Sequence, residues 1–184
     1  MSQFKIPSRE EVSPQNQEIF DQLQNKLGFV PNLYAYFAKN DAALGDFLNF
    51  QSRKNTLSAP EKEAVNLITS QINSCSYCLS AHTALAKMNG FTEEQILEIR
   101  SGEILFDKKL AALVNLTSSI IRNKGKASQS SQDHFFAAGY SEANLIDVAI
   151  TVGEKTISNY IHNLADFEID FPLASSLHKE ELHQ

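Results

Sequence analysis

The chain has 184 residues, a formal net charge of −6, two cysteines and no tryptophan. A chain of this length buries enough surface for a full core, so one domain over residues 1–184 is predicted. The acidic balance argues against a nucleic-acid partner, which needs clustered Lys and Arg. Two cysteines are too few for a disulfide framework.

No apolar stretch approaches the ~20 residues of a membrane-spanning helix, so no membrane partner is expected. The first residues, MSQFKIP, lack the apolar stretch of a signal peptide. We therefore expect a cytoplasmic protein. In that reducing compartment, two cysteines close in sequence indicate catalysis or metal binding more than a structural bridge.

Helix start and stop signals punctuate the first third of the chain. Pro14, after Ser13, stands at a favoured first helical position, and Gly28 is a typical helix stop. The predicted helices here are Pro14–Leu27, a short aromatic helix over 33–37, and a third that Asp41 caps.

Two capping boxes, in which Ser or Thr is followed three residues later by Glu or Gln, mark helix starts in the middle of the chain. Ser58 with Glu61 opens one helix, and Thr92 with Gln95 opens another. Further helices are predicted from Ser74 or Cys75 to Gly90, over 107–123, over 129–138, and in a long last helix capped by Ser141. No run of period-two alternation indicates a strand, so the predicted fold class is all-α.

An internal repeat emerges when the sequence is shifted by 49 residues. Residues 65–67 (VNL) then align with 114–116 (VNL), and 90–93 (GFTE) align with 139–142 (GYSE). Because caps, stops and apolar positions match together, we predict two similar helix-turn-helix units packed into one domain. The units are predicted at about residues 57–105 and 106–155.

The first unit contains the sequence CSYCLSAH, from Cys75 to His82. Cysteines three residues apart share one helix face, and His82 lies one turn beyond Cys78 on that face. Near a helix start, unpaired backbone N–H groups and the helix dipole favour the thiolate. His82 can then accept the Cys78 proton, and a second cysteine can resolve an oxidised first one. Helix position alone does not decide between the thiols, because Cys75 is nearer the helix start.

The repeat supplies an internal control for these three reactive positions. The counterparts of Cys75, Cys78 and His82 in the second unit are Lys124, Ala127 and Ser131. Scaffold positions agree between the copies, whereas the reactive positions differ. A role in packing alone would more often keep similar residues in both copies, so the difference favours a functional role.

From Glu63 to His82, the sequence resembles the E-x11-C-x-x-C-x3-H signature of the AhpD-like alkylhydroperoxidases, which belong to the carboxymuconolactone decarboxylase superfamily. The segments 159–163 (NYIHN) and 168–172 (EIDFP) resemble the longer, peroxidase-related branch of that superfamily. The resemblance implies an all-α, internally duplicated fold. It also implies a homo-oligomer, as a trimer, hexamer or dimer.

The same resemblance implies a thiol-dependent peroxidase that reduces hydroperoxides. Cys78 would be the peroxidatic thiolate, Cys75 the resolving thiol, and His82 with Glu63 a proton relay. The implied partners are a hydroperoxide substrate and a dithiol reductant protein or small thiol, with no cofactor. Tyr77 fills a position that is histidine in the best-known AhpD branch. Because its pKa of about 10 makes tyrosine a poor base near neutrality, Tyr77 is named only as an auxiliary candidate.

Two of the candidate residues have simpler interpretations outside the motif. Glu63 lies in the first turns of its helix, where an acidic residue is common, so spacing alone indicates a solvated charge. His162, on the last helix, is an auxiliary candidate, although a hydrogen-bonded structural histidine is the favoured expectation.

Two other functions stay open at this stage. A carboxymuconolactone decarboxylase would use a similar scaffold but generally works without the redox cysteines. A non-enzymatic zinc-binding or redox-sensing module would use Cys75, Cys78, His82 and Glu63 as a tetrahedral ligand set. The sequence has no second C-x-x-C or H-x3-H motif to close a structural zinc site, so no metal is predicted.

Overall fold

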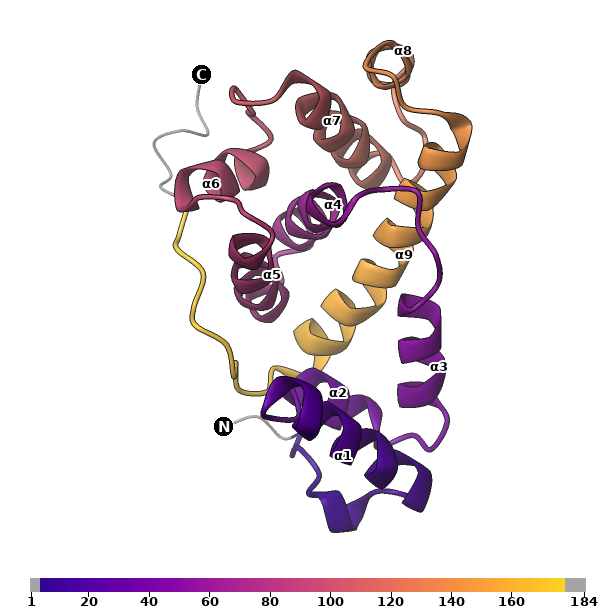
Figure 1. The fold of residues 1–184 in the computed structure, drawn as a ribbon, viewed down its shortest axis with the longest axis vertical. Helices are drawn as coiled ribbons and strands as arrows, with labels where there is room; N and C mark the ends of the chain where they lie inside the picture. The colour runs from indigo at the N-terminus through magenta and orange to yellow at the C-terminus, as the bar shows by residue number, and fades with distance from the viewer. Residues whose placement is uncertain (1–3, 178–184) are drawn as a thin grey trace. The chain divides into compact units, whose positions relative to one another are not determined.

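The computed structural model describes residues 4–177. Over this range the chain forms one short 3-10 helix and nine α-helices and contains no strand, which confirms the predicted all-α class (Figure 1). None of the helices in the described part is long and apolar enough to cross a bilayer. The contacts divide the chain into two compact units, which are not the repeat units of the sequence. The first compact unit comprises the described chain up to Lys54 together with Ile161–Asp170. The second comprises Asn55–Tyr160 together with the described residues from Phe171 onward. The single domain over residues 1–184 stays a prediction.

The first unit holds three α-helices near the start of the chain. They are α1 (Pro14–Leu27), α2 (Asn32–Phe37) and α3 (Ala43–Gln51), preceded by the 3-10 helix η1 (Arg9–Glu11). α3 packs against α1 and α2, and the Phe37 and Phe47 rings stack with centroids 4.6 Å apart. α1 ends as predicted before Gly28, which has a φ of 84° that an L side chain rarely adopts.

The predicted cap of α3 is wrong. Asp41 does not cap the helix, because the Asn40 side-chain oxygen accepts the backbone N–H groups of Ala42 and Ala43 at 3.1 and 3.2 Å. Asn side chains commonly bond to backbone groups two and three residues on, and this bond satisfies the donors that Asp41 was expected to take.

The second unit is built around α4 (Ala59–Ile72). The other helices are α5 (Ser76–Met88), α6 (Glu93–Ser101), α7 (Lys108–Arg122), α8 (Gln129–Ala137) and α9 (Glu142–Ala165), whose last turn belongs to the first unit. α4 packs against α5, α6 and α7, and α7 packs against α8 (Figure 1). Both capping boxes are confirmed: the Ser58 and Thr92 backbone N–H groups donate to Glu61 and Gln95 at 2.8 and 3.0 Å.

Helix boundaries in this unit repeat with the offset seen in the sequence. α7 begins 49 residues after α4, and α9 begins 49 residues after α6. The stop glycines correspond as well, because Gly90 and Gly139 have φ values of 97° and 91°. The starts of two helix pairs and the stop glycines therefore repeat with the offset of the sequence, whereas α8 begins 53 residues after α5.

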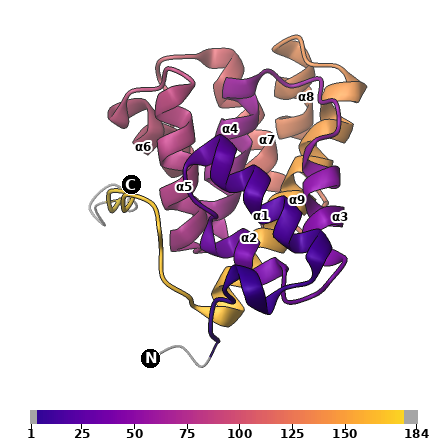
Figure 2. The same cartoon turned by 60° about the horizontal axis from the view of Figure 1, so that its bottom comes forward.

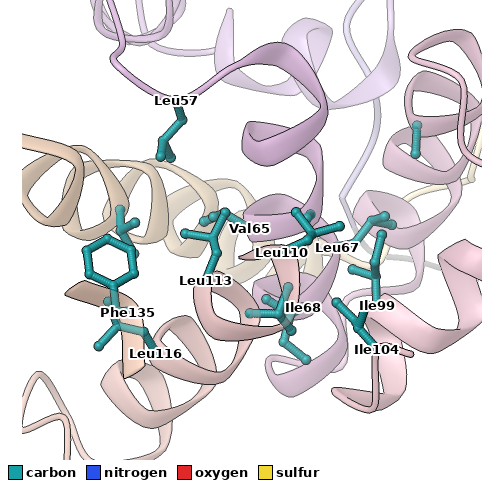
Figure 3. Packing of buried hydrophobic residues seen from close by; sticks show 14 of the residues in the cluster. Leu57, Val65, Leu67, Ile68, Ile99, Ile104, Leu110, Leu113, Leu116 and Phe135 are labelled. Carbon is teal, nitrogen blue, oxygen red and sulfur yellow. The ribbon is translucent and has the colours of Figure 1, made fainter. Parts of the chain in front are cut away.

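An apolar cluster between α4, α6, α7 and α8 forms the core of the second unit (Figure 3). We expect Leu113→Ala to lower the free energy of unfolding by about 2–5 kcal/mol, because the fully buried Leu113 leaves a cavity in this cluster. Leu105, which is 89% exposed, is the control, and Leu105→Ala is expected to change stability by less than about 0.5 kcal/mol. Chemical denaturation followed by circular dichroism measures both. Equal losses in the two variants would contradict the assigned core.

Candidate redox site

A sharp turn between α4 and α5 sets the position of the two cysteines. Ser74 has a φ of 54°, in the left-handed region, and the next N–H, that of Cys75, donates to the Ser70 carbonyl at 3.0 Å. Cys75 is thereby the N-cap of α5, and its Sγ accepts the backbone N–H of Cys78 at 3.4 Å. The sulfur occupies the place of the oxygen that usually caps a helix. Cys78 lies in the first turn of α5, where the helix dipole favours an anion.

Both cysteines are free thiols shielded from solvent, with Cys75 0% and Cys78 2% exposed. The hydrogen bond from Cys75 is the main cause that lowers the pKa of Cys78 to about 5, against the opposing effect of burial. The positive charges of Lys155 and His82 lower the same pKa further, as does a hydrogen bond from Asn159.

The pKa of Cys75 moves in the other direction. Its hydrogen bond to Cys78, its burial and the nearby Cys78 charge all raise this pKa. The two opposite shifts make Cys78 the more acidic thiol of the pair. This asymmetry separates two thiols that helix position alone left equivalent.

His82 and Glu63 form a buried pair beside the thiols. His82 Nδ1 lies 2.7 Å from Glu63 Oε2, and each residue is 9% exposed. Burial alone would raise the pKa of Glu63, but the His82 charge and hydrogen bond, with the Lys155 charge, hold it below its usual value. Glu63 is therefore a carboxylate that orients the imidazole.

The expectation that Glu63 is a solvated helix charge is wrong. α4 packs against three other helices, so few of its faces remain for solvent, even near its start. Asn66, one turn further along α4, donates its side-chain amide to Glu63 Oε1 at 3.4 Å. Glu63 is therefore buried beside His82, and its part in a proton relay stays a prediction.

Tyr77 packs beneath the segment that follows α9. It is 1% exposed, and the Phe171 ring meets it edge-on with centroids 5.6 Å apart. This segment runs along α5 toward α6 (Figure 2). Two further hydrogen bonds tie it down, from Ala174 N to Ser80 Oγ at 3.2 Å and from Arg100 Nη1 to the Ser175 carbonyl at 2.7 Å. Tyr77 thus makes a buried packing contact, and its auxiliary chemical role stays a prediction.

His162 belongs to the first compact unit. Its Nε2 lies 3.1 Å from the Phe167 carbonyl, and its ring meets the Phe167 ring edge-on at 4.8 Å. The residue is 3% exposed. These contacts are those of a hydrogen-bonded structural histidine, and a part in catalysis stays a prediction.

Sequence reasoning missed two buried polar residues of α9, Lys155 and Asn159. Asn159 donates to Ser70 Oγ at 3.2 Å, accepts from the Asn73 side chain at 3.0 Å, and lowers the pKa of both thiols. Lys155 is 3% exposed. The available signal was periodicity, because the apolar stripe through Val148 and Val152 continues onto these two positions.

The geometry gives little support to a zinc module. Among residues 4–177, no group of three or more His, Cys, Asp or Glu side chains is arranged to hold a metal ion. In the proposed ligand set, Nδ1 of His82 is already engaged by Glu63. Cys75 likewise uses its sulfur to cap α5.

The all-α fold is similar to that of a solved AhpD-core protein. Residues 37–106 match the model described as the carboxymuconolactone decarboxylase family. The matched range includes Glu63, Cys75, Cys78 and His82, the residues of the motif. No curated protein matches the sequence.

Solved structures with the same fold cover most of the chain. An uncharacterized peroxidase-related protein from Silicibacter sp. TM1040 is 20% identical with a TM-score of 0.80, covering 97% of this chain and 94% of that one. An AhpD-core, peroxidase-related protein from Ralstonia eutropha JMP134 is 17% identical with a TM-score of 0.83, covering 92% of each chain. The debrominase Bmp8 is 18% identical with a TM-score of 0.76, covering 92% of this chain and 93% of that one. At these identities the likeness establishes the fold.

Proposed function

We propose that the protein is a thiol-dependent peroxidase that reduces hydroperoxides through Cys75 and Cys78. The observation that carries the proposal is the asymmetry of the buried pair, in which the pKa of Cys78 is lowered to about 5 while that of Cys75 is raised. A thiolate is the form of cysteine that attacks, and a neighbouring neutral thiol is suited to resolve the product.

The reactive form is the Cys78 thiolate, whose proton has passed to His82 before the hydroperoxide binds. The Cys78 thiolate attacks the terminal oxygen of a hydroperoxide, and the O–O bond breaks to leave a sulfenic acid and an alkoxide. The alkoxide takes the proton from His82 and leaves as an alcohol. Cys75 then attacks the sulfenic sulfur, which forms the disulfide and releases water. A dithiol reductant, protein or small molecule, returns two electrons and two protons.

A stoichiometric oxidation tests this cycle. Reduced protein is mixed with one equivalent of hydroperoxide, and free thiols and intact mass are followed over time. We expect both thiols to be lost within seconds, with one hydroperoxide consumed and a Cys75–Cys78 disulfide found in the peptide map. Oxidation that takes hours, or that links cysteines of separate chains, would contradict the proposal.

The proton relay makes a separate prediction. We expect Glu63→Gln to slow hydroperoxide reduction about 10- to 100-fold, because the amide keeps a hydrogen bond to His82 but lacks the charge that stabilises the imidazolium. The matched control is Glu18→Gln, at an exposed position of α1. Steady-state rates with a dithiol reductant measure both variants. A Glu63→Gln rate equal to the wild type across pH would rule out this role for Glu63.

Two substrate tests distinguish the proposed peroxidase from enzymes with other activities. A lactone decarboxylase would turn over a carboxymuconolactone in the double Cys→Ser variant, whereas the proposed peroxidase would not. Bmp8 is a debrominase, and a cysteine-to-alanine variant of it binds 2,3,4-tribromopyrrole, so loss of bromide from this compound is a second substrate test.

The proposal also places the protein in the reducing cytoplasm and in a homo-oligomer. Light scattering measures the size of that oligomer.

A further inference from the structure

We propose that Lys155 is a positioning residue of this site, whose buried ammonium group is the countercharge that keeps Cys78 ionised. The inference builds on the proposed function, because it concerns the same thiol pair. Its test measures the ionisation of Cys78 in the protein without substrate, so it does not require turnover.

Two contacts between α4 and α9 fix where Lys155 lies. At one end the Lys62 ammonium lies 3.6 Å from Glu154 Oε2, and at the other Asn159 donates to Ser70 Oγ at 3.2 Å. Lys155 directly follows Glu154 and precedes Asn159 by one helical turn. It is therefore on the part of α9 that lies against α4, where only 3% of it is exposed.

On the α4 side of this contact lies the proposed proton relay of Glu63 and His82. Glu63 directly follows Lys62 on α4 and is bound to His82 of α5. Asn159, one turn beyond Lys155, donates to Ser70 Oγ at 3.2 Å, and the Ser70 carbonyl accepts the backbone N–H of Cys75 at 3.0 Å. The lysine charge accordingly acts on both anionic groups of the site, stabilising the carboxylate of Glu63 and the thiolate of Cys78.

A charge count explains why a cation is needed there. Lys155 and Glu63 have opposite charges, so the buried site is neutral while Cys78 is a thiol and His82 is uncharged. Moving the Cys78 proton to His82 then creates a second ion pair without changing the total charge. If Lys155 were absent, the thiolate would form in a buried site with an uncompensated negative charge, which is strongly disfavoured away from water.

The remaining charged groups at this contact do not substitute for Lys155. Lys62 is paired with Glu154, and the pair is neutral as a whole. Cys75 stays a neutral thiol that donates to Cys78. His82 gains its positive charge only by accepting a proton, so it cannot supply a permanent one.

The test is a pH titration of the thiolate by its ultraviolet absorbance in reduced protein. We expect Lys155→Met to raise the midpoint by about one pH unit or more, because loss of a nearby positive charge disfavours the thiolate. Lys155→Arg, which keeps the charge, is expected to restore a midpoint close to the wild type. Lys126→Met, at an exposed position, is the control and is expected to titrate like the wild type.

Two results would overturn the proposal. An unchanged midpoint in Lys155→Met would show that the lysine charge has no effect on the thiolate. Equal shifts in Lys155→Met and Lys155→Arg would show that the shape of the side chain, and not its charge, sets the midpoint. If helical circular dichroism is lost in Lys155→Met, the same criteria apply to Lys155→Gln. A protein that titrates as expected but reduces no hydroperoxide would contradict the proposed function and leave the role of Lys155 supported.

Discussion

We expect Cys78→Ser to slow hydroperoxide reduction by about a thousandfold or more, because a serine hydroxyl is not ionised near neutral pH and does not attack the O–O bond. The substitution replaces one atom in a buried site, so the fold is expected to persist. Steady-state consumption of hydroperoxide, with a dithiol reductant in excess, measures the loss.

Cys75→Ser is the matched variant, because it removes the other sulfur of the same helical turn. Serine can still donate to the Cys78 sulfur, so Cys78 is expected to react once and stop as a sulfenic acid. A sulfenic-acid probe should then label Cys78 with about one equivalent, while multiple turnovers are lost. An unlabelled Cys78 in Cys75→Ser, or full turnover in Cys78→Ser, would refute the assignment of the two thiols.

The second large effect concerns the pH dependence of Cys78. Its pKa is lowered to about 5, so thiolate absorbance should rise through pH 5 and be nearly complete at pH 7. An ordinary thiol with a pKa near 8.5 is only about 3% ionised at pH 7, so Cys78 would hold about thirty times more thiolate. The rate of sulfenic acid formation should follow the same curve, falling as the pH drops through 5 and the thiol reforms.

Cys75 provides the decisive comparison for this titration. Its hydrogen bond is the largest cause of the lowered pKa of Cys78, so Cys75→Ala, which cannot donate, should raise the midpoint. Cys78→Ser should show no thiolate signal in the acidic range, because the pKa of Cys75 is raised. If a signal near pH 5 remained in Cys78→Ser, the thiolate would lie on Cys75, and its assignment to Cys78 would be wrong.

Helix boundaries were predictable because the signals that set them act within a few residues. The capping boxes at Ser58 and Thr92 need only a side chain three residues away, and Gly28 needs only its own backbone freedom. Where two local options compete, such reasoning can fail. At α3, Asn40 and Asp41 are adjacent acceptors, and the sequence pattern did not show which would reach the helix.

Burial of charged residues was the part that local patterns did not reveal. Glu63 resembles a solvated charge until α4 is surrounded by other helices. Lys155 was overlooked for the same reason, although it continues the buried stripe of α9. Periodicity indicates which face of a helix is turned inward, but it does not indicate what that face meets.

By itself, then, the sequence determined an all-α chain with a repeated helix pattern, and it placed two thiols and a histidine on one face of a helix. Those properties depend on hydrogen bonds and side-chain spacing within a single helix. Only the tertiary structure shows that Glu63, Lys155 and Asn159 are buried like the two thiols, and that the pKa of Cys78 is lowered while that of Cys75 is raised. The pKa of a buried thiol depends on charges and donors brought from distant helices into a place without water, and no local pattern encodes those distances.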